Sequence, residues 1–199
     1  MADNQQFDPD PFKQFARWFA DAEQAELPLY NAMTLATASS SGRPSARMVL
    51  LKDVDARGFI FYTNYQGRKA QEIKENPFAS LVFYWQPLSR QVRVEGSVEM
   101  IASDESDRYF ASRPSGHQLE AHASVQSQVI KDRMVLEEQF KAFTKMFAGQ
   151  KIPRPVHWGG YRLIPDNLEF WQEGEHRLHD RLRYRHNDNN QWVIERLAP

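Results

Sequence analysis

The sequence predicts an α+β protein whose core is a barrel-like antiparallel sheet with flanking helices. Two observations predict this fold class. Strand-like runs follow one another with turn signals such as "SSSGRP", "DARG" and "QPLS" between them. The helical segments are segregated between groups of strands. A sheet of antiparallel strands with helices around it accounts for both patterns.

The N-terminal half predicts a tail, two helices and five strands. Residues 1–10 are polar and are expected to form a flexible tail. A helix follows, because apolar residues recur at helical spacing from Phe12 to Phe19. A short helix at 67–76 ends before Pro77, since the residue before a proline disfavours the helical conformation. Strands are expected at residues 32–39, 46–54, 58–64, 78–85 and 90–101.

The C-terminal half predicts a helical region followed by more strands. Residues 103–148 read as helical, with Ser103 as the N-cap. A loop, "KIPRPVHWGG", connects them to three or four strands at residues 161–165, 168–172, 180–185 and 191–197. Residues 11–199 are therefore expected to form a single domain.

Composition excludes several classes of protein. Lys plus Arg (25) nearly equals Asp plus Glu (26), so no global basic excess favours nucleic acid. There is no cysteine, hence no disulfide and no thiolate metal site. Neither a signal peptide nor a run of 18 apolar residues is present, so we expect a cytoplasmic protein that does not enter membranes. The motifs GxGxxG, GxxxxGK[ST], GxSxG and HExxH are absent, and no metal site is expected.

Basic residues beside hydroxyls form one candidate phosphate site. Tyr62 and Thr63 end an expected strand, and Arg68 and Lys69 begin the helix that follows. A helix N-terminus offers unpaired N–H groups and a partial positive charge, which favour phosphate. The alternative is an ordinary amphipathic helix with its basic residues in water.

A second basic cluster lies further along the chain. Tyr109 and Arg113 are four residues apart, which places them on one helix face. Two separate anion clusters indicate two phosphorylated ligands.

The segment "RLHDR" carries charge at every second position. If it is a strand, Arg177, His179 and Arg181 point to one face, where an anion would relieve their repulsion. A solvated edge strand is the alternative.

Eight segments in series resemble the pyridox(am)ine 5′-phosphate oxidase family. They are "RMVLLK", "FYTNYQGRKA", "RQVRVEG", "YFASRPSGHQ", "VQSQVI", "WGGYR", "EFWQEGEHRLHDR" and "RLAP". Each motif alone is weak, but together they run in the same order from about Ala32 to Pro199. The resemblance implies an FMN-binding split barrel, which is a Greek-key β-barrel with flanking helices. It also implies a homodimer with FMN at the subunit interface.

The resemblance further implies roles for individual residues. Arg177 and His179 are the expected catalytic residues over the substrate ring, with Leu178 also in contact with substrate. The residues expected to bind the substrate phosphate are Lys52, Tyr109, Arg113 and His117. The residues expected to bind FMN are Arg47, Met48, Val49, Leu50, Leu51, Lys52, Tyr62, Thr63, Arg68, Lys69, Gln91, Gln126, Ser127, Trp171 and Arg181.

Two positions depart from the family pattern. His117 stands where the family usually carries serine; histidine still donates a hydrogen bond, but it is larger and histidines titrate near neutral pH. Leu29 and Tyr30 replace an acidic residue and proline ahead of "NAM". Neither departure affects the flavin motifs.

The implied reaction oxidises the 4′ carbon of pyridoxine 5′-phosphate or pyridoxamine 5′-phosphate to give pyridoxal 5′-phosphate. FMN accepts the hydride, and O₂ is reduced to H₂O₂. Two alternatives stay open: a related oxidase acting on another aromatic, such as a phenazine precursor, and a flavin- or pyridoxal phosphate-binding protein without turnover. Lys52, Tyr109 and Arg113 favour the phosphorylated substrate.

Overall fold

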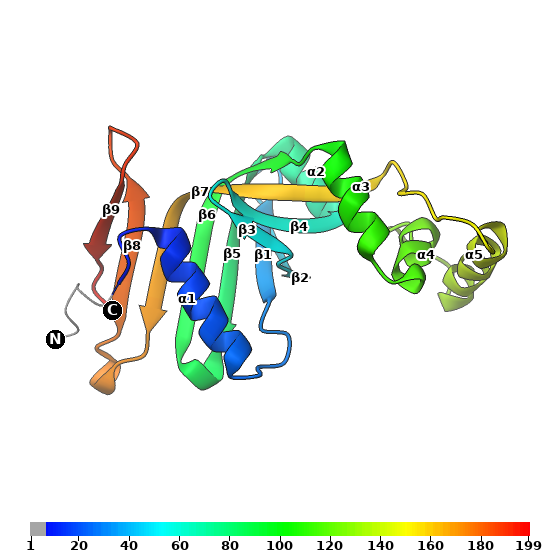
Figure 1. The fold of residues 1–199 in the computed structure, drawn as a ribbon. Helices are drawn as coiled ribbons and strands as arrows, with labels where there is room; N and C mark the ends of the chain where they lie inside the picture. Colours follow the sequence, from blue (N-terminus) through cyan, green and yellow to red (C-terminus); the bar gives the residue numbers. More distant parts are fainter. Residues whose placement is uncertain (1–6) are drawn as a thin grey trace.

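The computed structural model describes residues 7–199, in which one antiparallel sheet curls on itself with helices around it (Figure 1). The α+β prediction is confirmed. The strands are β1 Ala32–Ala38, β2 Pro44–Leu50, β3 Asp53–Asp55, β4 Gly58–Asn64, β5 Phe78–Trp85, β6 Arg90–Met100, β7 Trp158–Gln172, β8 Asp180–His186 and β9 Trp192–Arg196. The α-helices are α1 Pro11–Gln24, α2 Arg68–Glu75, α3 Ser103–Ser112, α4 Ser115–Ala123 and α5 Arg133–Met146. Short 3₁₀ turns are η2 Gln86–Leu88 and η3 Glu175–Arg177.

The strand order explains both the closure of the barrel and its split. Along the sheet the order is β2-β1-β5-β6-β7-β4-β3, and β8 and β9 extend from β7. One edge of β7 pairs with β4 over its first half and with β8 over its second half. The Lys52 N–H donates to the Ile60 carbonyl (2.9 Å), which ties the end of β2 to β4.

The core is aromatic, and α1 supplies part of it. Phe15 of α1 meets Phe59 at 4.9 Å and Phe83 at 5.1 Å, measured between ring centroids in edge-on arrangements. Such pairs add to the stabilisation from burial alone. The helix begins where it does because the Asp10 carboxylate accepts hydrogen bonds from the Phe12 and Lys13 N–H groups.

Part of the expected flexible tail, residues 1–6, lies outside the described residues. Residues 7–10 make defined contacts. Phe7 packs on Trp18 (6.0 Å between centroids), and the Tyr184 hydroxyl donates to the Asp8 carbonyl at 2.7 Å.

Several predicted element boundaries are wrong. The strand expected at 46–54 is two strands, β2 and β3, whereas the two expected at 161–165 and 168–172 are one strand, β7. The polar residues between the two expected strands had suggested a break in the sheet. They instead form a β-bulge in β7, opposite Glu95 and Gly96, and the strand continues through it.

The helical region 103–148 is interrupted after α3 and again after α4. Pro114 causes the first break, because Arg113 before it is extended (φ −71°, ψ 148°). The helix α3 begins at Ser103 itself, with Ala102 in the capping position. Asp132 caps α5 by accepting from the Val135 N–H (3.3 Å).

Only the last two residues of "RLHDR" lie on a strand, so the conditional strand interpretation of the whole segment does not hold. β8 begins at Asp180, and Arg177 belongs to the turn η3. His176 (φ 55°) and Arg177 (φ 64°) both lie in the left-handed region, which is uncommon for residues other than glycine. The alternation argument therefore does not apply to Arg177 and His179.

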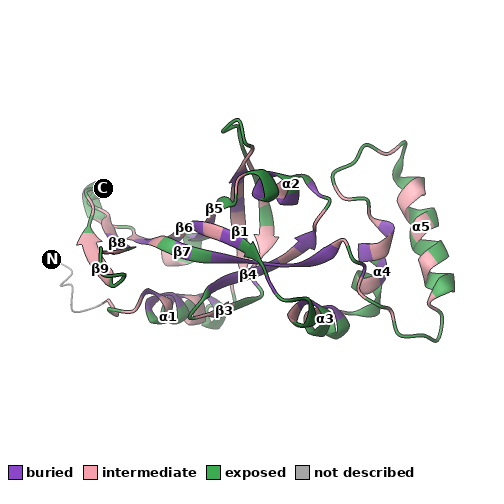
Figure 2. Cartoon of the chain, turned by 90° about the horizontal axis from the view of Figure 1, so that it is seen from above, coloured by how far each residue is buried: buried purple, intermediate pink, exposed green. Residues whose placement is uncertain are grey.

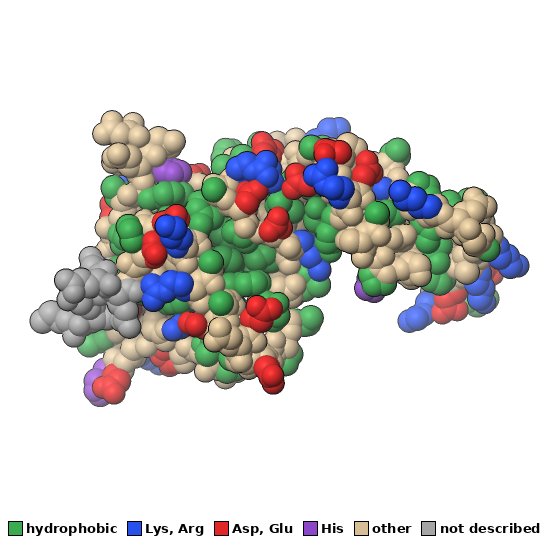
Figure 3. All heavy atoms as spheres, in the orientation of Figure 1, with side chains coloured by type: hydrophobic (Ala, Val, Ile, Leu, Met, Phe, Trp, Pro, Cys, Tyr) green, Lys and Arg blue, Asp and Glu red, His purple; other side chains and the backbone are tan. Residues whose placement is uncertain are grey.

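Figure 3 shows basic and acidic side chains interspersed over one face of the molecule. That face carries no broad patch of a single charge, in keeping with the formal net charge of −1. Within residues 7–199, none of the helices is long and apolar enough to cross a membrane.

The bulge makes Gly96 sensitive to substitution. A Cβ there would lie 2.0 Å from the Ile164 carbonyl oxygen, so Gly96→Ala should destabilise the protein by about 2 kcal/mol or more. Gly116→Ala is the control, because a Cβ at that position meets no atom within 4 Å. Urea unfolding midpoints measure both. Equal midpoints for the two variants would contradict the close approach of β6 and β7.

Candidate active site

Most of the residues expected at FMN and at the substrate phosphate line one cavity of about 570 Å³. This volume is in the range of small-molecule sites. From the predicted sets, its lining includes Met48, Val49, Leu50, Lys52, Tyr62, Thr63, Lys69, Tyr109, Arg113, His117 and Gln126. The two clusters proposed from the sequence therefore face the same space.

The N-terminus of α2 forms one wall of polar groups. Lys69 Nζ donates to Gln126 Oε1 (2.6 Å) and to Thr63 Oγ1 (3.0 Å). The Arg68 N–H donates to Ser127 Oγ (3.1 Å). Burial lowers the pKa of Lys69, and the positive charge of Arg47 lowers it further. An anion placed here would reverse both effects, since it would pair with the ammonium group.

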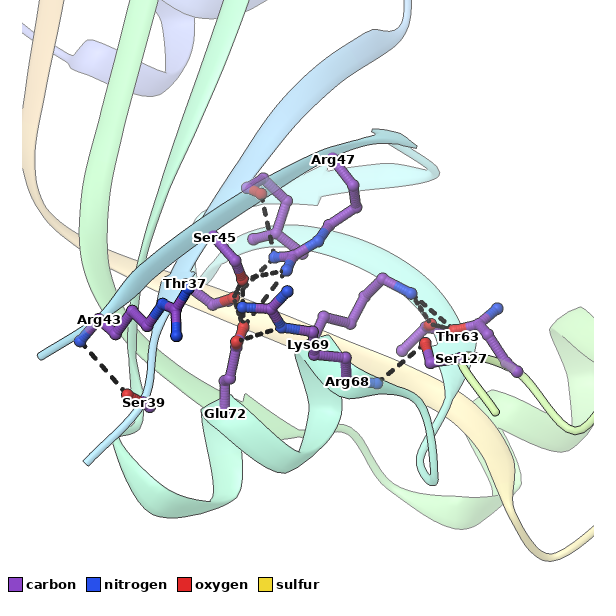
Figure 4. A network of polar contacts seen from close by, with 12 residues as sticks. Thr37, Ser39, Arg43, Ser45, Arg47, Thr63, Arg68, Lys69, Glu72 and Ser127 are labelled. Atoms are coloured by element: carbon purple, nitrogen blue, oxygen red, sulfur yellow. Dashed lines mark hydrogen bonds and ion pairs between the residues drawn. The ribbon is translucent and has the colours of Figure 1, made fainter. Parts of the chain in front are cut away.

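A buried carboxylate, Glu72, holds two of the expected FMN residues in place (Figure 4). Arg68 Nε donates to Glu72 Oε1 at 2.8 Å, and Arg47 Nη2 lies 3.3 Å from Glu72 Oε2. The Ser45 and Thr37 hydroxyls also donate to Oε2, each at 2.5 Å. Burial alone would raise the pKa of Glu72, but these hydrogen bonds outweigh burial and lower the pKa to about 2.

Stacked aromatic rings form a second wall. Tyr62 lies over Tyr109 (3.9 Å between centroids) and 5.4 Å from Trp158. The Arg113 guanidinium covers the Trp158 ring at 4.5 Å. Burial, with a smaller effect of Glu105, raises the pKa of Tyr62 to about 12, so its hydroxyl stays protonated at neutral pH.

The remaining expected FMN residues lie in register on the outer face of the sheet. Gln91 of β6 pairs with Trp171 of β7, which pairs with Arg181 of β8. Val92, Phe170 and Leu182, one neighbour of each along its strand, are buried in the core, so this row faces outward. Glu169 accepts from Arg181 Nε (2.8 Å) and Nη2 (3.0 Å), and this contact raises the pKa of Arg181.

The expected catalytic residues lie in the turn after β7. The His179 ring packs on Trp171 (4.8 Å), and its Nδ1 accepts from the Gly174 N–H at 3.2 Å. In the neutral ring, Nε2 therefore carries the proton. Arg177 is exposed and makes no hydrogen bond or ion pair to any described residue. Leu178 is also exposed.

One chain does not bring the cavity and the outer row together. β2 and β8 are five strand spacings apart, about 24 Å across the sheet. Figures 1 and 2 both show β8 at the opposite end of the molecule from α3 and α4, which border the cavity. Leu51 belongs to neither half, because its side chain is buried in the core.

Sequence reasoning missed several residues in and around the cavity wall. Glu72 could have been found, since it lies four residues after Arg68 on α2, a spacing that favours ion pairs. Trp158 begins the "WGGYR" segment of the resemblance but was assigned no role, and nothing in the neighbourhood of Glu120 marks it as a cavity residue. Within the described residues, no cluster of His, Asp and Glu could hold a metal ion.

Comparison with known families covers nearly the whole chain. Residues 19–147 match the family described as pyridoxamine 5′-phosphate oxidase. Residues 158–199 match the C-terminal dimerisation region of pyridoxine 5′-phosphate oxidase. This chain belongs to the pyridoxamine 5′-phosphate oxidase family.

Individual relatives agree with this family. A protein of Paraburkholderia phymatum is 57% identical over 96% of this chain and 90% of its own length. One of Trichormus variabilis is 54% identical with the same coverage. Both are named pyridoxine/pyridoxamine 5′-phosphate oxidase, and the expectation that the chain is an enzyme of this family is confirmed.

Solved structures confirm the split-barrel fold. PhzG from Burkholderia lata, in complex with tetrahydrophenazine-1-carboxylic acid, has a TM-score of 0.91 at 34% identity over 96% of this chain and 94% of PhzG. A pyridoxamine 5′-phosphate oxidase-related, FMN-binding protein from Nostoc punctiforme has a TM-score of 0.77 at 18% identity, covering 97% and 100% of the two chains.

The environment of Glu72 predicts a pH-dependent stability. Because its folded pKa is below its ordinary value of 4.5, its contribution is present above pH 4.5 and is lost as pH falls toward 2. Glu72→Gln should cost on the order of 2 kcal/mol at pH 7, and this difference from wild type should shrink toward pH 2.

Urea unfolding at several pH values measures the effect of Glu72. Glu75→Gln, an exposed carboxylate on the same helix, is the control and should change the midpoint little. A cost for Glu72→Gln that does not vary with pH would argue against a charge-dependent role.

Proposed function

We propose that the protein is an FMN-dependent oxidase that converts pyridoxine 5′-phosphate or pyridoxamine 5′-phosphate to pyridoxal 5′-phosphate, reducing O₂ to H₂O₂. The observation that carries this proposal is the single cavity lined by both the expected FMN residues and the expected substrate-phosphate residues. Membership of the oxidase family supports it.

The residues at α2 fit the phosphate of FMN. Lys69 at the start of the helix and the Thr63 hydroxyl line one wall of the cavity. Gly67, which precedes the helix, has no side chain to cap it, and the Ser127 hydroxyl accepts from the Arg68 N–H instead. Arg47 and Arg68, which Glu72 holds in place, add positive charge near these groups.

A second group fits the phosphate of the substrate. Lys52, Tyr109, Arg113 and His117 line the cavity from β2–β3, α3 and α4. Anchoring a remote phosphate orients the reacting carbon, so binding energy lowers the barrier of a step at which the phosphate does not react.

Chemistry and orientation have different sources in this proposal. When bound, FMN supplies the hydride acceptor and the reaction with O₂. Arg177 and His179 would hold the substrate ring from the opposite side, with His179 fixed against Trp171 and its Nε2–H free to donate. Gln91, Trp171 and Arg181 would hold the flavin ring.

A second copy of the chain would complete each site. Trp171, Arg181 and the turn η3 lie within the segment that matches a dimerisation region. Gln91 lies outside that segment but pairs with Trp171. The same outer face exposes apolar side chains, with Met48 62% and Tyr84 60% exposed. An isologous dimer places the row of each chain near the cavity of the other, with FMN at the interface.

The similarity to PhzG keeps a phenazine-type substrate as the second candidate. One assay separates the candidates. Purified protein loaded with FMN is incubated in air with pyridoxine 5′-phosphate, and pyridoxal 5′-phosphate and peroxide are measured. We expect both products in equal amounts. Absence of turnover with both phosphorylated substrates would overturn the proposal.

We expect Arg113 to bind the phosphate of the substrate and to make no contact with its pyridine ring. Arg113→Ala should lower kcat/KM for pyridoxine 5′-phosphate roughly ten- to a hundredfold, the loss of one charge-assisted hydrogen bond. It should barely change the poor turnover of unphosphorylated pyridoxine. Arg108→Ala, an exposed position on α3, the helix that ends just before Arg113, is the control. Equal losses for the two substrates would assign Arg113 a structural role.

Sites shared between chains make a complementation test possible. A heterodimer of Arg113→Ala and Arg177→Ala chains, purified through two different affinity tags, should have about half of wild-type activity. One of its sites carries both changes and the other carries neither. Sites built within single chains would instead leave the heterodimer as inactive as the two homodimers.

A further inference from the structure

Glu120 is an acidic residue in an otherwise basic cavity. Among the described residues that line the cavity it is the one carboxylate, facing Lys52, Lys69, Arg113 and His117. It projects from α4, three residues after His117, so the two side chains share a helix face. A carboxylate that faces the position of a bound phosphate weakens anion binding, which calls for a specific role.

The contact of Glu120 with Arg113 indicates that role. Glu120 Oε2 lies 3.9 Å from Arg113 Nη2, longer than a hydrogen bond. Arg113 is otherwise poor in partners: its Nη1 is buried without a hydrogen bond, and its guanidinium rests on the Trp158 ring. Burial lowers the pKa of Arg113, and the charge of Glu120 opposes that shift.

We propose that Glu120 is a positioning residue that pairs with Arg113 when no phosphate is bound and is displaced by the phosphate of substrate or product. The proposal rests on the function proposed above. Glu120 is 58% exposed, so it can swing into solvent when the phosphate arrives. The loose 3.9 Å geometry and the exposure of the carboxylate are those of an exchangeable partner, whereas the buried carboxylate of Glu72 contacts its arginines at 2.8 and 3.3 Å.

Competition of this kind affects substrate and product alike. Both carry the same phosphate, so Glu120 weakens the binding of both and leaves the reacting carbon untouched. Removing the charge should therefore lower KM and tighten product inhibition by the same factor, without raising kcat. An exposed ion pair at this distance changes affinity about three- to fivefold.

The test compares wild type with Glu120→Gln as FMN-loaded protein. Binding of inorganic phosphate and of pyridoxal 5′-phosphate is measured by calorimetry, which does not depend on turnover. We expect both to bind about three- to fivefold more tightly to Glu120→Gln, with KM for pyridoxine 5′-phosphate lowered in parallel. Unchanged or weaker binding would overturn the proposal. Failure of the wild-type protein to turn over substrate would overturn the proposed function instead, because the binding of inorganic phosphate is measured independently of turnover.

Two further variants make the result specific to Arg113. Glu138→Gln removes the same charge from the exposed surface of α5, outside the cavity, and should leave phosphate affinity unchanged. In an Arg113→Ala background, Glu120→Gln should have no effect on phosphate affinity, because the partner it competes for is gone. A gain of equal size in both backgrounds would mean that Glu120 acts by general repulsion and would refute the pairing.

Discussion

The double pairing of β7 is the constraint on which the rest of the structure depends. One edge of this strand pairs with β6 along most of its length, while the other edge pairs first with β4 and then with β8. Its first half therefore closes the barrel behind the cavity, and its second half carries the outer row. A single strand thus fixes how far the cavity and the outer row lie from each other within one chain.

Two carboxylates, one beside the cavity and one lining it, balance positive charge in different ways. Glu72 is buried, bonded by four side chains and strongly acidic, so it fixes Arg47 and Arg68 whether or not an anion is present. Glu120 is exposed and loosely paired, so it yields to an anion. The same residue type thus serves as a permanent counter-ion at the predicted cofactor end and as a temporary one at the predicted substrate end, and burial makes the difference.

Local signals in the sequence predicted the strands, the first helix and the basic clusters, because periodicity and turn residues are local properties. They did not predict continuity across residues 161–172, since a β-bulge tolerates the polar residues that read as a break. They also gave no sign of the turn at His176 and Arg177, where two successive left-handed residues redirect the chain. Arg113, Trp158 and Glu120 meet only through tertiary packing, so spacing along the chain could not reveal their contact.

The helix α5 is attached to the rest of the molecule more weakly than any core strand. None of its residues is buried, and Figure 2 shows it in exposed and intermediate colours throughout. Its aromatic contact runs through His122 of α4, which lies 5.3 Å from Phe143 and 5.0 Å from Phe147. Local opening costs least where few apolar contacts must break. Amide hydrogens of α5 will therefore exchange with solvent well before those of β6 and β7. Unfolding of the molecule will begin at α5 and reach the core strands later.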